Sequence, residues 1–376
     1  MSLLESILRS YATLVHRHSR KILAFFFLIT FVVALGIGNI ELESDINEQM
    51  PQHLPIFKLN DRIENKFSGQ DTIFLLFMLD DDLNVRETPK DILDPVIMEY
   101  LLRIEPILER ESKIDSVVSI RPVIEAAKQQ DPDLSISTVS EILRHSPQSE
   151  GLVSDDRKKM IVMLRTNVGN SEKETEEINE LIHEKIDALS TPPGTNIMVT
   201  GQAPVMSTIL DLLRYDSVYT LIVAFILIFP LIIVVQKSLR RALMISVSLF
   251  LALLLTGGTL GWLNIKISFA TAGLGAMVLG LGVEYGVFML TRYREERGKD
   301  VQIKALKEAI PRVGSAIIGS GSTTMIGFLA LTLSIIPMMQ NLGLTLAIGI
   351  FYCIISSVIV LPAIIINDEA LLGVEK

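Results

Sequence analysis

The sequence predicts an α-helical membrane protein with six transmembrane helices and one extracytoplasmic α+β domain inserted between spans 1 and 2. The chain has 376 residues, 49% of them hydrophobic, and a mean hydropathy of +0.44. Six separate runs approach the ~20 mostly apolar residues that a spanning helix needs. Residues 39–216, between the first and second of these runs, are polar and numerous enough for one compact domain.

The apolar runs give the expected order of segments along the chain. Residues 1–20 repeat apolar side chains at helical spacing, which predicts an amphipathic helix on the cytoplasmic membrane surface. This leader favours a retained anchor in span 1, although the short first run also fits a cleaved signal peptide. We expect spans 1 to 6 at 21–38, 217–235, 242–263, 269–291, 313–335 and 342–366, and a cytoplasmic tail at 367–376.

Lysine and arginine predict the orientation of these spans, because cytoplasmic loops carry an excess of them. They concentrate in the leader, between spans 2 and 3, and in the segment 292–312 after span 4. On the opposite side the short loops hold only Lys266. Both termini are therefore expected in the cytoplasm and the domain at 39–216 outside. We expect the basic stretch 292–307 to form a cytoplasmic surface helix of mixed charge rather than a binding site.

Within the outer domain, short runs rich in β-branched and large apolar residues alternate with helical patterns. The strands are expected at 72–79, 116–120, 160–164 and 196–200. The helices are expected at 95–112, 137–144 and 172–189, with Pro106 kinking or breaking the first. This order predicts helices packed on one face of a sheet.

The outer domain is acidic, since Asp and Glu clearly outnumber Lys and Arg between 40 and 214. Solubility of an exposed domain explains this balance; the alternative is attraction of cationic partners, for which Asp80-Asp81-Asp82 is the one visible cluster. Nucleic-acid binding is disfavoured. The chain shows no metal-ligand spacing, phosphate loop or nucleophile–base pair, so we expect no cofactor, no metal and no enzymatic activity. Its one cysteine, Cys353, is expected to pack as a small hydrophobe in span 6.

Span 4 contains a single charged residue, Glu284. An ionised carboxylate in hydrocarbon costs at least ~2.5 kcal/mol, so a carboxyl group at this depth indicates ion or proton handling. Glu284 precedes Arg292 by eight residues, which places it roughly 12 Å inside the cytoplasmic boundary at ~1.5 Å per residue. Burial favours the neutral form of a carboxyl group, so small changes around it can switch its charge. The alternative is a permanently neutral glutamate that hydrogen-bonds neighbouring helices.

Other polar and small residues of spans 4 and 5 are candidates to support Glu284. Tyr285 can donate its hydroxyl to a carboxylate, or it can simply pack. In span 5, Ser320 and Thr324 share a helix face and, with Thr323, form a candidate polar cluster; alternatively, such hydroxyls bond backbone carbonyls one turn back. Three glycines of span 4 permit close helix approach, with a moving hinge as the alternative: Gly280, Gly282 and Gly286.

The sequence around Glu284 resembles a known family. Span 4 and its exit read Gly-Leu-Gly-Val-Glu-Tyr-Gly at 280–286 and Arg-Tyr-Arg-Glu-Glu at 292–296. Together with the segment 43–51, Val-Thr-Gly at 199–201, the Ser/Thr-rich span 5 and Leu-Pro-Ala at 361–363, they resemble the resistance-nodulation-division (RND) superfamily in its MmpL-like branch. Two features depart from that family. Glu284 stands where the family has an aspartate, and the chain holds one set of six spans where most members have two.

The resemblance implies a transporter, driven by the proton-motive force, that exports hydrophobic or amphiphilic molecules such as lipids across the plasma membrane of a prokaryote. Glu284 and Tyr285 would be its proton-coupling residues. In two-repeat members the corresponding pairs of the two halves interact reciprocally, which implies a homodimer or higher homo-oligomer for a half-size chain. Two alternatives stay open: a lipid-binding, sterol-sensing-like membrane protein that does not pump, and a component of protein export similar to SecD or SecF.

Overall fold

The computed structural model describes residues 3–42, 51, 71–80, 89–146, 151–166 and 172–371. The chain divides into two compact units, one formed by Met1–Pro51 with Leu212–Lys376 and the other by Gln52–Asp211. Each unit has its own hydrophobic core. Residues 43–50 of the family-like segment, Asp81-Asp82 and the last five residues of the predicted tail lie outside the described residues.

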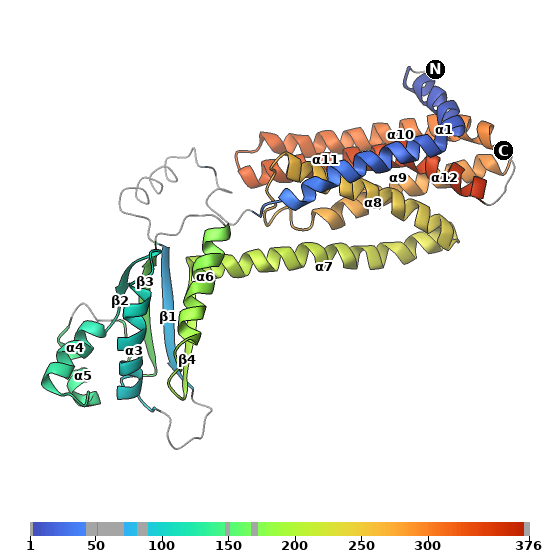
Figure 1. Cartoon of the computed structure of the whole chain (residues 1–376). Coiled ribbons are helices and arrows are strands. Elements are labelled where there is room, and N and C mark those ends of the chain that lie inside the picture. The colour runs from blue at the N-terminus through green and yellow to red at the C-terminus, as the bar shows by residue number, and fades with distance from the viewer. Residues whose placement is uncertain are drawn as a thin grey trace. The chain divides into compact units, whose positions relative to one another are not determined.

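The first unit is a helical bundle (Figure 1). Six candidate spans are long and apolar enough to cross a membrane, which confirms the predicted membrane fold class. Their helices are α1 (Leu3–Ala34), α7 (Gln202–Gln236), α8 (Leu239–Trp262), α9 (Leu274–Arg297), α10 (Gln302–Ala330) and α11 (Pro337–Ile355), which continues through the π-helical turn Ser356–Val360 into α12 (Leu361–Leu371). Short 3-10 turns at Leu35–Asn39 and Leu331–Leu333 follow α1 and α10.

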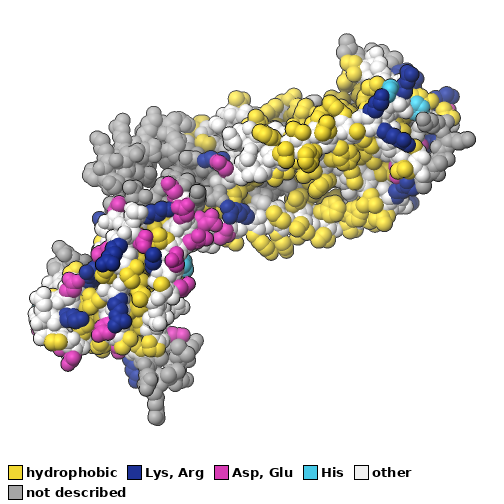
Figure 2. Space-filling view, in the orientation of Figure 1, with side chains coloured by type: hydrophobic (Ala, Val, Ile, Leu, Met, Phe, Trp, Pro, Cys, Tyr) yellow, Lys and Arg dark blue, Asp and Glu magenta, His cyan; other side chains and the backbone are white. Residues whose placement is uncertain are grey.

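The bundle has inner and outer helices. In their most apolar windows, α8, α9 and the α11–α12 span bury 56%, 44% and 61% of their residues, whereas α1, α7 and α10 bury 11%, 6% and 11%. The outer helices therefore present apolar side chains to their surroundings, as the yellow surface of this unit shows in Figure 2. Such a surface is stable in hydrocarbon and would be costly in water.

Two local features differ from or refine the expected segments. The leader and the first apolar run form two helical segments of α1, which meet at a kink where His18 is not helical (φ −131°, ψ 29°). The expectation of a separate surface helix from Arg292 onward is wrong, because α9 extends to Arg297 and α10 begins at Gln302. Charge pairs within these helix ends support their extension into water, including Arg292–Glu296 (2.6 Å) and Lys304–Asp300 (3.1 Å).

The second unit is an α+β domain. Its antiparallel sheet has the strand order β2-β3-β1-β4, formed by Ile114–Val118, Lys159–Thr166, Asp71–Leu79 and Thr195–Gly201. Alternate residues of β1, namely Ile73, Leu75 and Phe77, are at most 1% exposed and belong to the core. Helices α3 (Pro95–Leu108) and α6 (Glu172–Asp187) lie against the sheet (Figure 1), and their buried apolar side chains belong to the same core.

The helices of this unit follow local start and stop signals. Asp94 caps α3 by accepting a hydrogen bond from the Val96 amide (3.0 Å), and Pro95 occupies its first turn. Pro106 does not break α3, which ends two residues later at Leu108. The sequence did not predict α4 (Arg121–Gln130), a short helix that begins at Arg121 and has Pro122 in its first turn. It is followed by α5 (Ile136–Arg144).

Candidate functional site

Helix α9 presents Glu284 and Tyr285 to different surroundings. Glu284 lies on the exposed side of the helix, whereas Tyr285 is only 2% exposed. The other exposed residues of α9 at this level follow the same side of the helix: Met277, Gly280, Phe288 and Thr291. Because successive residues of an α-helix are rotated by about 100°, the neighbouring Tyr285 turns into the bundle. Glu284 therefore sits on the outer surface of an apolar unit, so the expectation of a buried carboxyl group is wrong for the single subunit.

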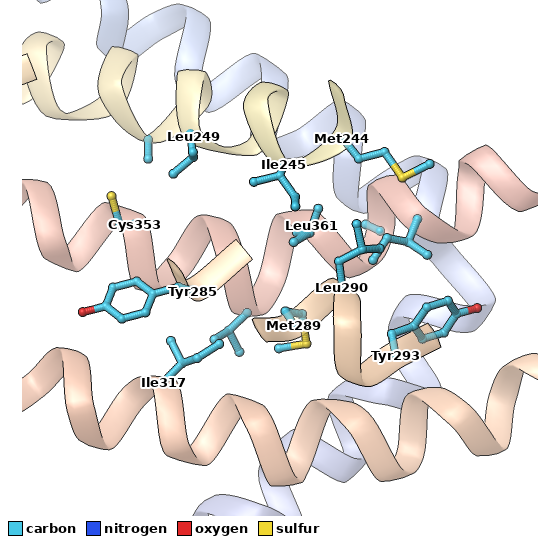
Figure 3. Packing of buried hydrophobic residues seen from close by; sticks show 14 of the residues in the cluster. Met244, Ile245, Leu249, Tyr285, Met289, Leu290, Tyr293, Ile317, Cys353 and Leu361 are labelled. Carbon is cyan, nitrogen blue, oxygen red and sulfur yellow. The ribbon is translucent and has the colours of Figure 1, made fainter. Parts of the chain in front are cut away.

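Tyr285 reaches the polar residues of α10. Its ring lies between the helices that carry Ile317 and Cys353 (Figure 3). Its hydroxyl interacts with the side chains of Thr324 and Ser320. Gly321, next to Ser320, permits the close approach of α11, since a Cβ there would lie 2.5 Å from Ile354 Cδ1. The hydroxyl group of a deeply buried tyrosine thus has polar partners on the neighbouring helix α10, as such groups require.

The threonines of α10 also hydrogen-bond their own helix. Thr323 and Thr324 both donate to the Ser320 carbonyl oxygen, at 2.7 and 3.1 Å. For Thr324, therefore, the backbone alternative holds, and its side chain also meets the Tyr285 hydroxyl. The structure joins Tyr285, Ser320 and Thr324 but leaves Glu284 apart. Within the described chain, the Glu284 carboxylate forms no hydrogen bond or ion pair.

A hollow of about 540 Å³ adjoins Tyr285 on the outer side of α9 and α10. Tyr285 and Ser320 line one part of it, and Arg292 and Glu295 line another. Between them lies Thr291, whose hydroxyl accepts a hydrogen bond from Gln236 at the end of α7 (3.0 Å). The hollow connects the polar cluster with the charged end of α9, where water is available.

The three candidate packing glycines divide into two kinds. A Cβ at Gly282 would lie 2.5 Å from Cys353 Sγ on α11, and one at Gly286 would lie 2.9 Å from Ile245 Cγ2 on α8. These two glycines permit the close helix approach expected of them. Gly280 differs, because a Cβ there meets no atom of the described residues within 4 Å. It lies on the Glu284 side of α9.

The bundle contains a second polar contact, which the sequence did not predict. Ser248 of α8 and Ser356 at the start of the π-helical turn are each 1% exposed, and their hydroxyl oxygens lie 2.8 Å apart. Ser356 Oγ also donates to the Ser248 carbonyl oxygen. Short π-helical segments frequently mark functional sites. The Ser356-Ser357 pair inside an otherwise apolar run was the available signal.

Comparison with known proteins assigns the chain to a class of membrane proteins. The MMPL family profile matches residues 111–368, more than half of the chain, so the chain belongs to the MMPL family. It is 28% identical over 373 residues to a membrane protein of Methanocaldococcus jannaschii, covering 98% of this chain and 95% of that one. It is also 25% identical over 221 residues to the siderophore exporter MmpL5 of Mycobacterium tuberculosis.

The fold has a counterpart among solved structures. The hedgehog release protein Disp from the water bear Hypsibius dujardini matches 98% of this chain with a TM-score of 0.69 and 13% sequence identity. The chain spans 50% of that protein and 23% of MmpL5, but nearly all of the archaeal relative. These relations confirm the predicted RND and MmpL-like fold, with one set of six candidate spans among the described residues.

Proposed function

We propose that the protein exports hydrophobic or amphiphilic molecules, lipids among them, and that protonation of Glu284 couples this export to the proton-motive force. The observation that carries the proposal is the position of Glu284, a carboxyl group on the outer surface of a helix within an apolar bundle. A group in hydrocarbon favours its neutral form, and a partner or water favours its charged form. The charge of Glu284 can therefore change when its surroundings change from hydrocarbon to a partner or water.

The exposed side of α9 and α10 supports a second copy of this chain as the partner that covers Glu284. Ionisable residues in spans usually face protein or water rather than lipid. Beside Glu284, the outer side of α10 carries small residues that allow close helix approach: Ala316, Gly319, Ser320, Thr323 and Gly327. A homodimer packed through this side would cover Glu284 and bring it toward the polar cluster of the other subunit, in a twofold arrangement common to oligomers.

The charge distribution supports a plasma-membrane protein with both termini in the cytoplasm. Lys and Arg gather at the end of the bundle that holds both termini (Figure 2). There, Arg240 pairs with Asp368 at 2.6 Å, and Arg297 pairs with Glu369 at 3.3 Å. An excess of basic residues marks the cytoplasmic side. In this orientation the α+β unit is extracytoplasmic.

Transport by the full chain in proteoliposomes tests the coupling role of Glu284. The probe is a phospholipid with a fluorescent headgroup, whose movement between leaflets is measured with and without an imposed pH gradient. We expect gradient-stimulated movement in the wild type, its loss in Glu284→Gln, and unchanged binding of the probe by that variant. Equal stimulation in Glu284→Gln would contradict the coupling role.

A non-pumping lipid-binding or sterol-sensing-like protein is the second candidate function. The likeness to Disp and the exposed apolar surface favour it as much as they favour transport. The same assay separates the two, because a binding protein would retain the probe without gradient-dependent movement. A role like that of SecD or SecF has less support, since the named relatives include exporters and transport proteins.

A further inference from the structure

The second unit contains a buried carboxyl group that the proposed function does not use. Glu105, on the inner side of α3, is 2% exposed. Its Oε1 atom has no hydrogen-bond partner among the residues that the structure describes. Glu105 also lines a pocket of about 810 Å³ beside α4 and the end of α5. A buried carboxylate without full pairing is costly, so its retention requires an explanation.

Arg121 does not neutralise Glu105. Its guanidinium lies 2.8 Å from Glu125 Oε1 and 3.1 Å from Glu109 Oε2, but 4.0 Å from Glu105 Oε2. The two closer carboxylates are also the exposed ones, with side chains 54% and 44% exposed. The Arg121 guanidinium is therefore shared by three carboxylates. Glu105, the most buried of them, is the farthest from it and has the weakest electrostatic attraction to it.

The remaining contacts of Glu105 show the same deficit. The Ser119 side chain hydrogen-bonds Glu105 and accepts a hydrogen bond from the Arg121 amide at 2.9 Å. His145, at the end of α5, is the further titratable residue that lines the pocket. Burial raises the pKa of Glu105 to about 7. Near neutral pH, Glu105 is thus partly neutral and partly charged when no ligand occupies the pocket.

We propose that this pocket binds a small organic cation in which a protonated primary amine is joined to an apolar group. The Glu105 carboxylate would turn toward the pocket and serve as the counter-ion of the ammonium, with Glu109 and Glu125 adding to the negative potential. Apolar side chains supply the other part of the lining, including Val117, Val118 and Ile142. They suit the body of an organic amine, whereas a hydrated metal ion gains nothing from them.

The proposed site gives the acidity of the outer domain a specific use. Solubility explains exposed carboxylates such as Glu109 and Glu125 but not a buried one such as Glu105. The site also stands apart from the membrane cluster, since all its residues belong to the second unit. It does not rest on the proposed function, and a failure of either proposal leaves the other standing.

Calorimetric titration of the full chain in nanodiscs tests the site. The probe is 2-phenylethylamine, and its neutral match is 2-phenylethanol, with empty nanodiscs as the reference. At pH 8 we expect saturable binding of the amine and none of the alcohol. Glu105→Gln should weaken amine binding about tenfold or more, equivalent to ~1.4 kcal/mol. Glu99→Gln is the matched control, because Glu99 lies on the same helix with its side chain 57% exposed.

Two further measurements make the result decisive. At pH 7, amine binding should release protons, seen as a heat that varies with the buffer, and Glu105→Gln should abolish this release. If Glu105→Gln fails to fold, the exposed pair Glu109→Gln and Glu125→Gln should weaken binding by lowering the negative potential. Equal behaviour of the amine and the alcohol overturns the proposal. Wild-type affinity for the amine in a folded Glu105→Gln variant also overturns it. If that variant does not fold, wild-type affinity in the Glu109→Gln and Glu125→Gln double variant overturns it instead.

Discussion

Glu284 and Tyr285 are consecutive residues of α9, yet Glu284 is exposed on the outside of the bundle and Tyr285 is buried within it. One peptide bond therefore separates the surface of the unit from its interior. The Tyr285 hydroxyl reaches Thr324 and Ser320 of the neighbouring helix α10. A change in what surrounds Glu284 can reach α10 through Tyr285 without any long relay.

We predict that a second subunit covers the Glu284 side of α9. Phe288 lies one turn after Glu284 and is 55% exposed. With Cys353→Ala as background, Phe288→Cys should form a disulfide-linked dimer on mild oxidation in nanodiscs. Leu243→Cys is the control, because Leu243 is 48% exposed on α8, near the same end of the bundle. Cross-linking at neither position, or equally at both, would contradict an interface through this side.

Glu284→Asp should keep most of the gradient-driven transport that Glu284→Gln loses. Aspartate is one methylene shorter but retains an ionisable carboxyl group, whereas glutamine can only hydrogen-bond. We expect Gln to lower the stimulated rate about tenfold or more, ~1.4 kcal/mol in free-energy terms, and Asp to lower it by less. Measured in the same proteoliposomes, equal losses in both variants would show that size and packing, rather than protonation, matter at this position.

Removing the Tyr285 hydroxyl should have a small effect on stability and a larger one on coupling. Tyr285→Phe keeps the buried ring and leaves Thr324 bonded to the Ser320 carbonyl. We expect a loss of ~1 kcal/mol in the free energy of unfolding, the usual worth of one hydrogen bond. Thermal unfolding in detergent measures this loss, and gradient-driven transport measures coupling. Unchanged transport would reduce Tyr285 to a packing residue.

The two kinds of glycine in α9 should respond differently to alanine. Gly282→Ala places a Cβ 2.5 Å from Cys353 Sγ, and such overpacking usually costs ~1–3 kcal/mol. Gly280→Ala meets open space and should leave the stability of the subunit unchanged or raised by less than ~1 kcal/mol. Thermal unfolding distinguishes them. Because Gly280 lies on the Glu284 side, its variant should weaken dimerisation if that side is the interface.

The sequence predicted the membrane class well because spans need long apolar runs, which are visible without any knowledge of packing. The strands of the outer unit were placed within two residues at each end, since β-branched runs mark them. Helix α4 was missed because its sequence is mostly polar and its apolar residues are few. The direction in which Glu284 faces could not be predicted, because it depends on which neighbours surround α9.

The Glu105 cluster could not be predicted for a related reason. The cluster is assembled from three parts of the chain: Glu105 in α3, Ser119 and Arg121 at the start of α4, and His145 at the end of α5. No sequence spacing joins these three parts. On the helical pattern of α3, Glu105 follows the buried Ile104, so it falls at the edge of the apolar side. Only the packing of α4 against α3 turns this edge position into a buried one.

The stability of the second unit should depend on pH through Glu105. Burial raises its pKa from 4.5 to about 7, so between these values the folded state holds a proton that the unfolded state has released. The favourable contribution is therefore complete below about pH 4.5 and is lost as the pH rises to about 7, by up to about 3 kcal/mol.

Hydrogen exchange of the β1 and β3 amides in the full chain measures this dependence once intrinsic exchange rates are removed. Glu105→Gln cannot titrate, so its protection relative to the wild type should rise between pH 5 and pH 7.5. Glu99→Gln should follow the wild type, because its side chain is exposed. A constant difference between wild type and Glu105→Gln over this range would mean that Glu105 ionises as readily in the folded as in the unfolded chain. In that case an ammonium ion could bind without releasing a proton, and the buffer-dependent heat expected at pH 7 would be absent.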